Sequence, residues 1–187
     1  MGPYYLHPLI LDFNILNINK SKTRVSFRTL IKNPIHLLSF GLGLGLSPIA
    51  PGTFGTLAAL PVYWLIRDIG LSEYLMITVV MFAIGIYLCE KTSSSLAIGD
   101  HSGIVFDEIV GLLVALMAIP FSFSNLLLGF VVFRFFDALK PWPIRVLDRR
   151  VHGGLGIMLD DLAAGLMANL AVRLAIDVKW PVLGSFY

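Results

Sequence analysis

From about residue 36 onward, the sequence consists mainly of apolar stretches separated by short polar segments. Five stretches can be recognised, at about residues 52–66, 74–88, 104–119, 126–139 and 155–176. Only 14% of the 187 residues are charged, against roughly 25% in an ordinary soluble domain. Such a chain could not cover a soluble fold of this size with polar side chains. The sequence therefore predicts an all-α membrane protein, folded as a polytopic helical bundle.

Several of these stretches are shorter than the roughly 20 residues that span a bilayer. We therefore expect some to be tilted, short or re-entrant, with four or six spans as alternatives to five. Residues 37–46 could add a further re-entrant piece. Residues 1–34 are interpreted as a polar, basic N-terminal extension, and residues 35–187 as the membrane-embedded domain. The extension is expected to be a mobile tail, with an interfacial helix on anionic lipid as the alternative.

The distribution of basic residues predicts the orientation, because positive loops face the cytoplasm. If the five segments alternate in direction, the N-terminal side holds ten lysines and arginines and the opposite side holds three. The chain is therefore expected to be a multi-pass inner-membrane protein with a cytoplasmic N-terminus. A net charge of only +2 gives no reason to expect a nucleic-acid partner.

Half of the twelve acidic residues fall at the cytoplasmic ends of the predicted segments, where apolar helices should resist them. A charge costs about 2.5–3.5 kcal/mol at the centre of a membrane helix and less near its ends. Two of these acids form one adjacent pair and two form another, and such pairs repel unless a cation lies between them. Carboxylates of this kind suit Mg²⁺, although ion pairs with Arg134 and Lys140 are an alternative. The six are Asp100, Asp107, Glu108, Asp137, Asp160 and Asp161.

Glycines follow two of these acids at helical spacing. Gly111 lies four residues after Asp107, and Gly165 lies four residues after Asp161. Each acid therefore shares a helix face with a glycine, and a glycine lets a neighbouring helix approach closely. The pattern predicts that acids from different helices are brought within reach of one ion, unless the glycines only reflect their frequency in membrane helices.

Two basic side chains are expected at the same level as the acids. Arg134 and Asp137 are three residues apart and could form a self-contained ion pair. Alternatively, Arg134 faces a substrate anion while Asp137 faces the metal. Lys140 could hold a lipid phosphate or serve as a plain interfacial anchor.

A glycine-rich loop at residues 41–56 precedes the first predicted segment and could cradle a phosphate at a helix N-terminus. Ser47, Thr53 and Thr56 could donate hydrogen bonds there, although helix capping is the commoner role of such residues. His101 could act as a general acid, although most isolated loop histidines have no such role.

Four runs of sequence together resemble the phosphatidylglycerophosphatase A family, and they occur in the order typical of it. They are residues 45–59, 100–111, 133–145 and 151–165, and the resemblance extends over most of residues 33–175. It implies an α-helical, Mg²⁺-dependent lipid phosphatase of the bacterial inner membrane. Such an enzyme would hydrolyse phosphatidylglycerophosphate to phosphatidylglycerol and inorganic phosphate, with its active site at the cytoplasmic face.

The residues and the resemblance together give a set of expected roles. Metal binding or water activation is assigned to Asp107, Glu108, Asp160 and Asp161, with Asp137 as a further catalytic candidate. Phosphate binding is assigned to Arg134, Lys140, Ser47 and Thr53, and Asp100 and His101 are secondary candidates. Direct attack by water and an aspartyl-phosphate intermediate both remain open. A small transporter and a non-catalytic assembly subunit are the competing functions.

Overall fold

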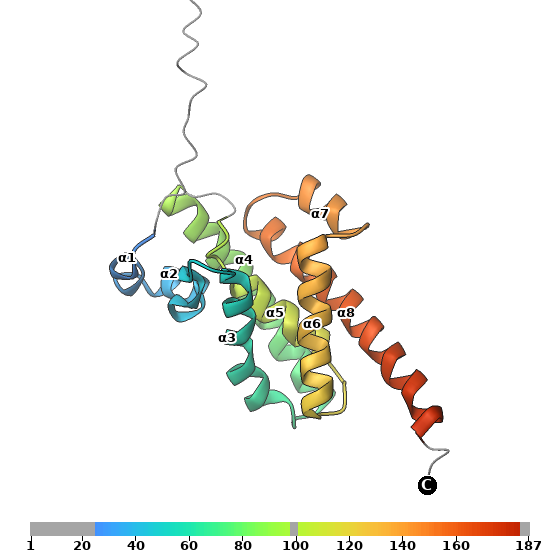
Figure 1. The fold of residues 1–187 in the computed structure, drawn as a ribbon. Helices are drawn as coiled ribbons and strands as arrows, with labels where there is room; N and C mark the ends of the chain where they lie inside the picture. The colour runs from blue at the N-terminus through green and yellow to red at the C-terminus, as the bar shows by residue number, and fades with distance from the viewer. Residues whose placement is uncertain (1–24, 98–100, 184–187) are drawn as a thin grey trace, which may run out of the picture.

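The computed structural model describes residues 25–97 and 101–183, with side chains described as far as residue 177. Within these ranges the chain is helical and contains no strand, so the predicted all-α class is confirmed for them (Figure 1). The elements are α1 (Phe27–Ile31), α2 (Pro34–Ser39), the 3₁₀ segment η2 (Gly41–Leu46), α3 (Pro51–Ile66), α4 (Leu71–Leu96), α5 (Phe106–Leu116), α6 (Phe123–Leu139), α7 (Ile144–Arg150) and α8 (Gly153–Leu183).

The five predicted apolar segments correspond to α3, α4, α5, α6 and α8, which run in alternating directions (Figure 1). Of the described helices, α4 and α8 are long and apolar enough to cross a membrane. With 11 residues, α5 is only about 16 Å long, against a hydrocarbon core of about 30 Å. The number of spans therefore stays a prediction.

Helix α4 presents an apolar face to its surroundings. Met76, Val80, Ile84 and Tyr87 are exposed and recur at intervals of three or four residues, so they form one stripe along the helix. The opposite face carries buried residues that include Thr78. An exposed apolar stripe is the reverse of a soluble surface helix, and it suits contact with lipid.

Helix α5 forms the core of the bundle. All of its residues except Asp107 are buried, and it packs against α3, α4, α6 and α8. A helix that is apolar on every side is stable only when neighbours surround it. The two acids in its first turn, Asp107 and Glu108, are therefore held at the centre of the bundle end.

Glycines bring α5 and α8 into backbone contact. A Cβ atom added at Gly165 would collide with the carbonyl oxygen of Gly111, and one added at Gly111 would lie 3.0 Å from the carbonyl oxygen of Asp161. The predicted close approach is thus confirmed. Asp107 and Asp161 lie one turn before these glycines, at the end of the same helix contact.

Replacing Gly165 with alanine is expected to lower the free energy of unfolding by about 1–3 kcal/mol, because the added methyl group meets rigid backbone. The Gly129→Ala variant is the matched control, since its Cβ would meet only the movable end of Leu116, at 2.5 Å from Cδ2. Thermal unfolding in detergent measures both. Equal midpoints for the two variants would contradict the close α5–α8 contact.

The N-terminal elements pack beside the end of α4. Ser26 caps α1 and Asn33 caps α2, each through a side-chain oxygen that accepts a backbone N–H. His36 Nδ1 lies 3.0 Å from Thr92 Oγ1, which ties α2 to the last turns of α4. The predicted re-entrant piece at residues 37–46 thus consists of the end of α2 and η2. Residues 1–24 of the predicted extension lie outside the described residues.

Candidate active site

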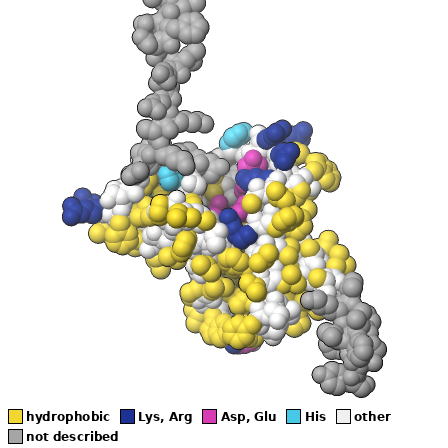
Figure 2. Space-filling model, viewed as in Figure 1, with side chains coloured by type: hydrophobic (Ala, Val, Ile, Leu, Met, Phe, Trp, Pro, Cys, Tyr) yellow, Lys and Arg dark blue, Asp and Glu magenta, His cyan; other side chains and the backbone are white. Residues whose placement is uncertain are grey.

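Charged side chains meet where α3, α5 and α8 begin and α6 ends. The arrangement follows from the alternating helix directions, which bring segments that are distant in sequence to one end of the bundle (Figure 1). Figure 2 shows acidic side chains at this end, with basic side chains beside them. The predicted convergence of the acids is therefore present in the fold, except for Asp100, which lies outside the described residues.

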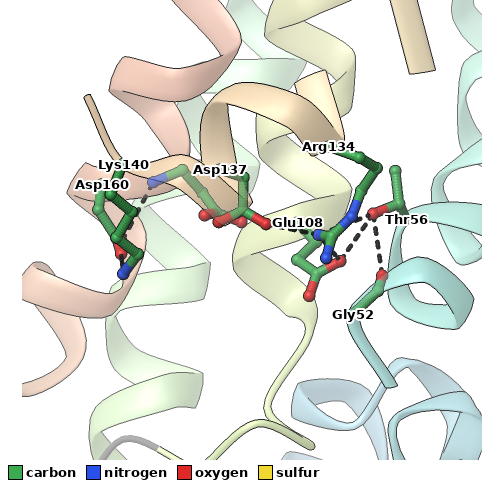
Figure 3. Close-up of polar contacts among 8 residues, drawn as sticks. Gly52, Thr56, Glu108, Arg134, Asp137, Lys140 and Asp160 are labelled. Atoms are coloured by element: carbon green, nitrogen blue, oxygen red, sulfur yellow. Dashed lines mark hydrogen bonds and ion pairs between the residues drawn. The ribbon is translucent and has the colours of Figure 1, made fainter. Parts of the chain in front are cut away.

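Arg134 of α6 lies between two carboxylates (Figure 3). Its Nη1 is 2.8 Å from Glu108 Oε2 and 2.6 Å from Asp137 Oδ2. The pair with Asp137 was one of the two predicted alternatives, whereas the pair with Glu108 joins α6 to α5. Arg134 Nη2 points toward the start of α3, because a Cβ added at Gly52 would lie 2.6 Å from it. A glycine at this position therefore leaves room for the guanidinium group.

Thr56 completes this cluster from α3. Its buried hydroxyl oxygen is 2.7 Å from Glu108 Oε2 and 2.9 Å from the carbonyl oxygen of Gly52. Arg134 Nη1 donates to the same hydroxyl at 3.4 Å. Glu108 therefore accepts hydrogen bonds from two helices, which fixes the position of its carboxylate.

Lys140 links α6 to α8. It ends α6 in a left-handed conformation, with φ of 43°, and its ammonium group forms ion pairs with Asp148 and Asp160. An ammonium group has three donors, so one remains for a further anion. Because it binds Asp160, Lys140 is more than an interfacial anchor, and its role in holding a phosphate stays a prediction.

Asp107 and Asp161 lie beside these ion pairs, but each has one buried oxygen with no hydrogen-bond partner, namely Asp107 Oδ1 and Asp161 Oδ2. The two carboxylates repel each other, and Glu108, Asp137 and Asp160 add to the repulsion. Buried carboxylates without partners are costly. Among the described residues, no group of three or more histidine, cysteine or acidic side chains is already arranged around a metal position.

Some predicted site residues lie apart from the cluster. The hydroxyl group of Ser47 donates to the carbonyl oxygen of Ile49 at 2.8 Å, which is a local turn contact. No hydrogen bond joins Thr53 to the cluster in the described part of the chain. His101 Nδ1 accepts the backbone N–H of Gly103 at 2.9 Å, and its ring packs against Phe40. The contacts of Ser47 and His101 are thus those of loop structure.

Comparison with known proteins identifies the family to which this chain belongs. The family model for phosphatidylglycerophosphatase A matches residues 37–176, which include every described member of the cluster. The chain belongs to the phosphatidylglycerophosphatase A family. As a member of this family, it is a phosphatase. No solved structure matches the chain.

Three relatives show how far the similarity extends. The Escherichia coli K12 phosphatidylglycerophosphatase A is 44% identical over 167 residues, covering 89% of this chain and 93% of that protein. Its Haemophilus influenzae counterpart is 45% identical over 142 residues, covering 75% of this chain and 87% of that protein. A Bacteroides thetaiotaomicron relative, provisionally named a phosphatidylinositol-3-phosphatase, is 34% identical over 154 residues, covering 78% and 94% respectively.

Sequence reasoning underestimated one residue of the cluster and missed another beside it. It named Thr56 only as a possible hydrogen-bond donor of the glycine-rich loop. Glu90, near the end of α4, accepts the backbone N–H of Gly154 at 2.6 Å and so caps the start of α8, the helix that carries Asp160 and Asp161. For Thr56, the weak signal was its place four residues after a helical glycine. For Glu90, the neighbouring sequence gave no signal.

The Thr56→Val variant is expected to lower the free energy of unfolding by about 1–3 kcal/mol, because Glu108 would lose a hydrogen bond in a buried setting. Thr78→Val is the matched control, since the Thr78 hydroxyl is buried and donates only to the carbonyl oxygen of Tyr74 in its own helix. Midpoints of thermal unfolding in detergent compare the two variants. A loss at Thr78 as large as that at Thr56 would contradict a specific role for the Glu108 contact.

Proposed function

We propose that this protein hydrolyses phosphatidylglycerophosphate to phosphatidylglycerol and inorganic phosphate, in the last step of phosphatidylglycerol synthesis. The names of the two relatives that are 44% and 45% identical support this substrate. The two helices α4 and α8, which are long and apolar enough to cross a membrane, support a lipid substrate. The excess of basic residues at one end supports an inner-membrane location with the site facing the cytoplasm.

The proposal includes a Mg²⁺ ion held by Asp107 and Asp161. The observation that carries this part is the pair of buried, unpartnered carboxylate oxygens, one from α5 and one from α8. Mg²⁺ commonly binds through one or two carboxylates, several waters and a substrate phosphate, so a prearranged group of three protein ligands is not required. Bound Mg²⁺ would polarise the phosphoryl group and stabilise the charge on the leaving oxygen.

The ion pairs refine the predicted ligand set. Glu108 and Asp160 were expected to bind metal together with Asp107 and Asp161. In the structure, Glu108 forms an ion pair with Arg134, and Asp160 forms one with Lys140. We infer that these two carboxylates orient the cations, while Asp107 and Asp161 offer free oxygens. Asp137 lies at the same level and remains a candidate to accept the proton of an attacking water molecule.

In this proposal, Arg134 and Lys140 receive the substrate phosphate. Within the described part of the chain, the ion pairs and hydrogen bonds of Arg134 are made by Nη1. We infer that Nη2, beside Gly52 at the start of α3, donates to a phosphate oxygen. A helix N-terminus there adds backbone N–H donors. The third donor of Lys140 can bind the same group. Positioning and electrostatic stabilisation of this kind supply most of the catalysis in phosphoryl transfer.

Release of inorganic phosphate by the purified full-length chain tests this function. The expected result is hydrolysis of phosphatidylglycerophosphate that EDTA abolishes and Mg²⁺ restores. Phosphatidylinositol 3-phosphate is the second substrate to assay, because the relative that is 34% identical carries that name. If neither lipid released phosphate, a transporter or an assembly subunit would be favoured. Acid quenching with radiolabelled substrate would show whether an aspartyl-phosphate forms.

A further inference from the structure

An exposed apolar surface lies on the N-terminal elements. Phe27 and Ile31 are four residues apart on α1 and are 54% and 56% exposed, whereas Leu30 is fully buried. The family-model match begins at residue 37, so α1 precedes it, although the alignment with the Escherichia coli relative is long enough to include α1. The candidate active site does not use the exposed side chains of α1, so their exposure needs a separate explanation.

The surface continues onto α2 and η2. Leu38, Leu42 and Leu44 are exposed, with Leu42 at 68%. The ring of Phe27 packs beside Gly43, where an added Cβ would lie 2.9 Å from Phe27 Cε2, so α1 and η2 are in direct contact. Figure 2 shows hydrophobic side chains gathered over α1 and α2, with basic side chains at their outer edge. We call Phe27, Ile31, Leu38, Leu42 and Leu44 the N-terminal apolar patch.

The basic residues of α1 lie next to the apolar stripe. Arg28 and Lys32 are four residues apart, so they occupy one face of the helix, about 100° around from Phe27 and Ile31. Both are exposed, and neither forms an ion pair with any residue in the described ranges. A helix with adjacent apolar and cationic faces suits the boundary between acyl chains and anionic headgroups.

The position of the patch along the bundle agrees with that boundary. Both ring nitrogens of His36 contact the last turns of α4, through Thr92 at 3.0 Å and Ser95 at 3.2 Å. Helix α4 is one of the two candidate membrane spans, so α1 and α2 sit where that span ends rather than at its middle. The lipid-facing stripe of α4 therefore ends at the level of the patch.

We propose that α1 and α2 form an interfacial anchor, in which the N-terminal apolar patch inserts into the membrane leaflet beside the active site and Arg28 and Lys32 bind anionic lipid. The occupant of the patch is thus an anionic lipid surface. A second protein would have to match an apolar face bordered by two unpaired cations, whereas lipid offers acyl chains and phosphate groups in that order.

A fluorescent label on single introduced cysteines of the full-length chain tests the anchor. Ile31→Cys places an environment-sensitive dye in the patch, and Thr29→Cys, on the opposite side of the same short helix, is the matched control. Cys89, the only natural cysteine, is buried. Any labelling of Cys89 is measured on the parent chain and subtracted. The protein is studied in nanodiscs of phosphatidylcholine with and without phosphatidylserine.

The expected result is blue-shifted emission at position 31, with shielding from aqueous acrylamide and quenching by doxyl-labelled lipid, while position 29 stays accessible to water. Phosphatidylserine should strengthen insertion of the parent protein by roughly fivefold for each of the two basic residues. The Arg28→Gln/Lys32→Gln variant should not respond to phosphatidylserine. Equal accessibility of both labels overturns the proposal. So does shielding of position 31 from acrylamide without quenching by doxyl-labelled lipid, which would assign the patch to a protein contact. No readout depends on phosphatase activity, so failure here leaves the proposed function standing.

Discussion

Replacement of Asp161 with asparagine is expected to abolish phosphate release and, at the same time, to raise the unfolding midpoint of the metal-free protein. Asp161 Oδ2 and Asp107 Oδ1 are buried without partners and repel each other. Removing one charge relieves that repulsion by about 1–3 kcal/mol, which amounts to several degrees in a chain of this size. Under the proposed function Asp161 is a metal ligand, and its loss should lower activity at least ~100-fold, because each factor of ten requires only about 1.4 kcal/mol.

The parent protein should also gain stability when Mg²⁺ is added, because an ion that binds only the folded state stabilises it. The Asp161→Asn variant should show no such gain. Asp68→Asn is the control, since Asp68 is a largely exposed residue paired with Arg67 at the other end of the bundle, and it should keep both activity and the Mg²⁺ response. Full activity of Asp161→Asn, or a Mg²⁺ response equal to that of the parent, would contradict the metal assignment.

Local sequence patterns predicted much of the fold and part of the site. Hydropathy located the five longer helices of the bundle, because each buries or presents an apolar face. It ended the second segment near residue 88, whereas α4 continues to Leu96. The reason is that residues 90–95 are polar, and hydropathy reports an apolar environment rather than the presence of a helix. Helical spacing correctly indicated that Gly111 and Gly165 would allow close packing.

Contacts between distant helices could not be predicted in the same way. Glu108 pairs with Arg134, 26 residues later, and with Thr56, 52 residues earlier. Neither separation has a local signature, since it depends on how α3, α5 and α6 are arranged around one another. Sequence reasoning therefore identified the charged residues of the site but could not say which cation neutralises which carboxylate. That pairing decides which oxygens remain available to a metal.

Substitutions of Arg134 separate its structural role from binding of substrate phosphate. Arg134→Met should lower the free energy of unfolding by about 3–5 kcal/mol, because Glu108 and Asp137 would lose their cation in a mostly buried setting. Arg134→Lys keeps the charge and should cost about 1 kcal/mol in stability, since one ammonium group can still contact the carboxylates. If Arg134 binds the substrate phosphate as proposed, activity should nevertheless fall at least ~100-fold in Arg134→Lys. A point charge cannot replace a planar fork that binds carboxylates through Nη1 and would bind phosphate through Nη2.

Thermal unfolding in detergent and phosphate release from phosphatidylglycerophosphate measure the two effects separately. The double variant Arg134→Met/Glu108→Gln provides the internal control, because removing one carboxylate together with its cation should restore part of the lost stability. Activity should not return with it. If Arg134→Lys were fully active, Arg134 would serve only to balance the two acids. The phosphate would then have to be bound by Lys140 and the start of α3, and the ion pair between α5 and α6 would be a structural device that holds Glu108 away from the metal.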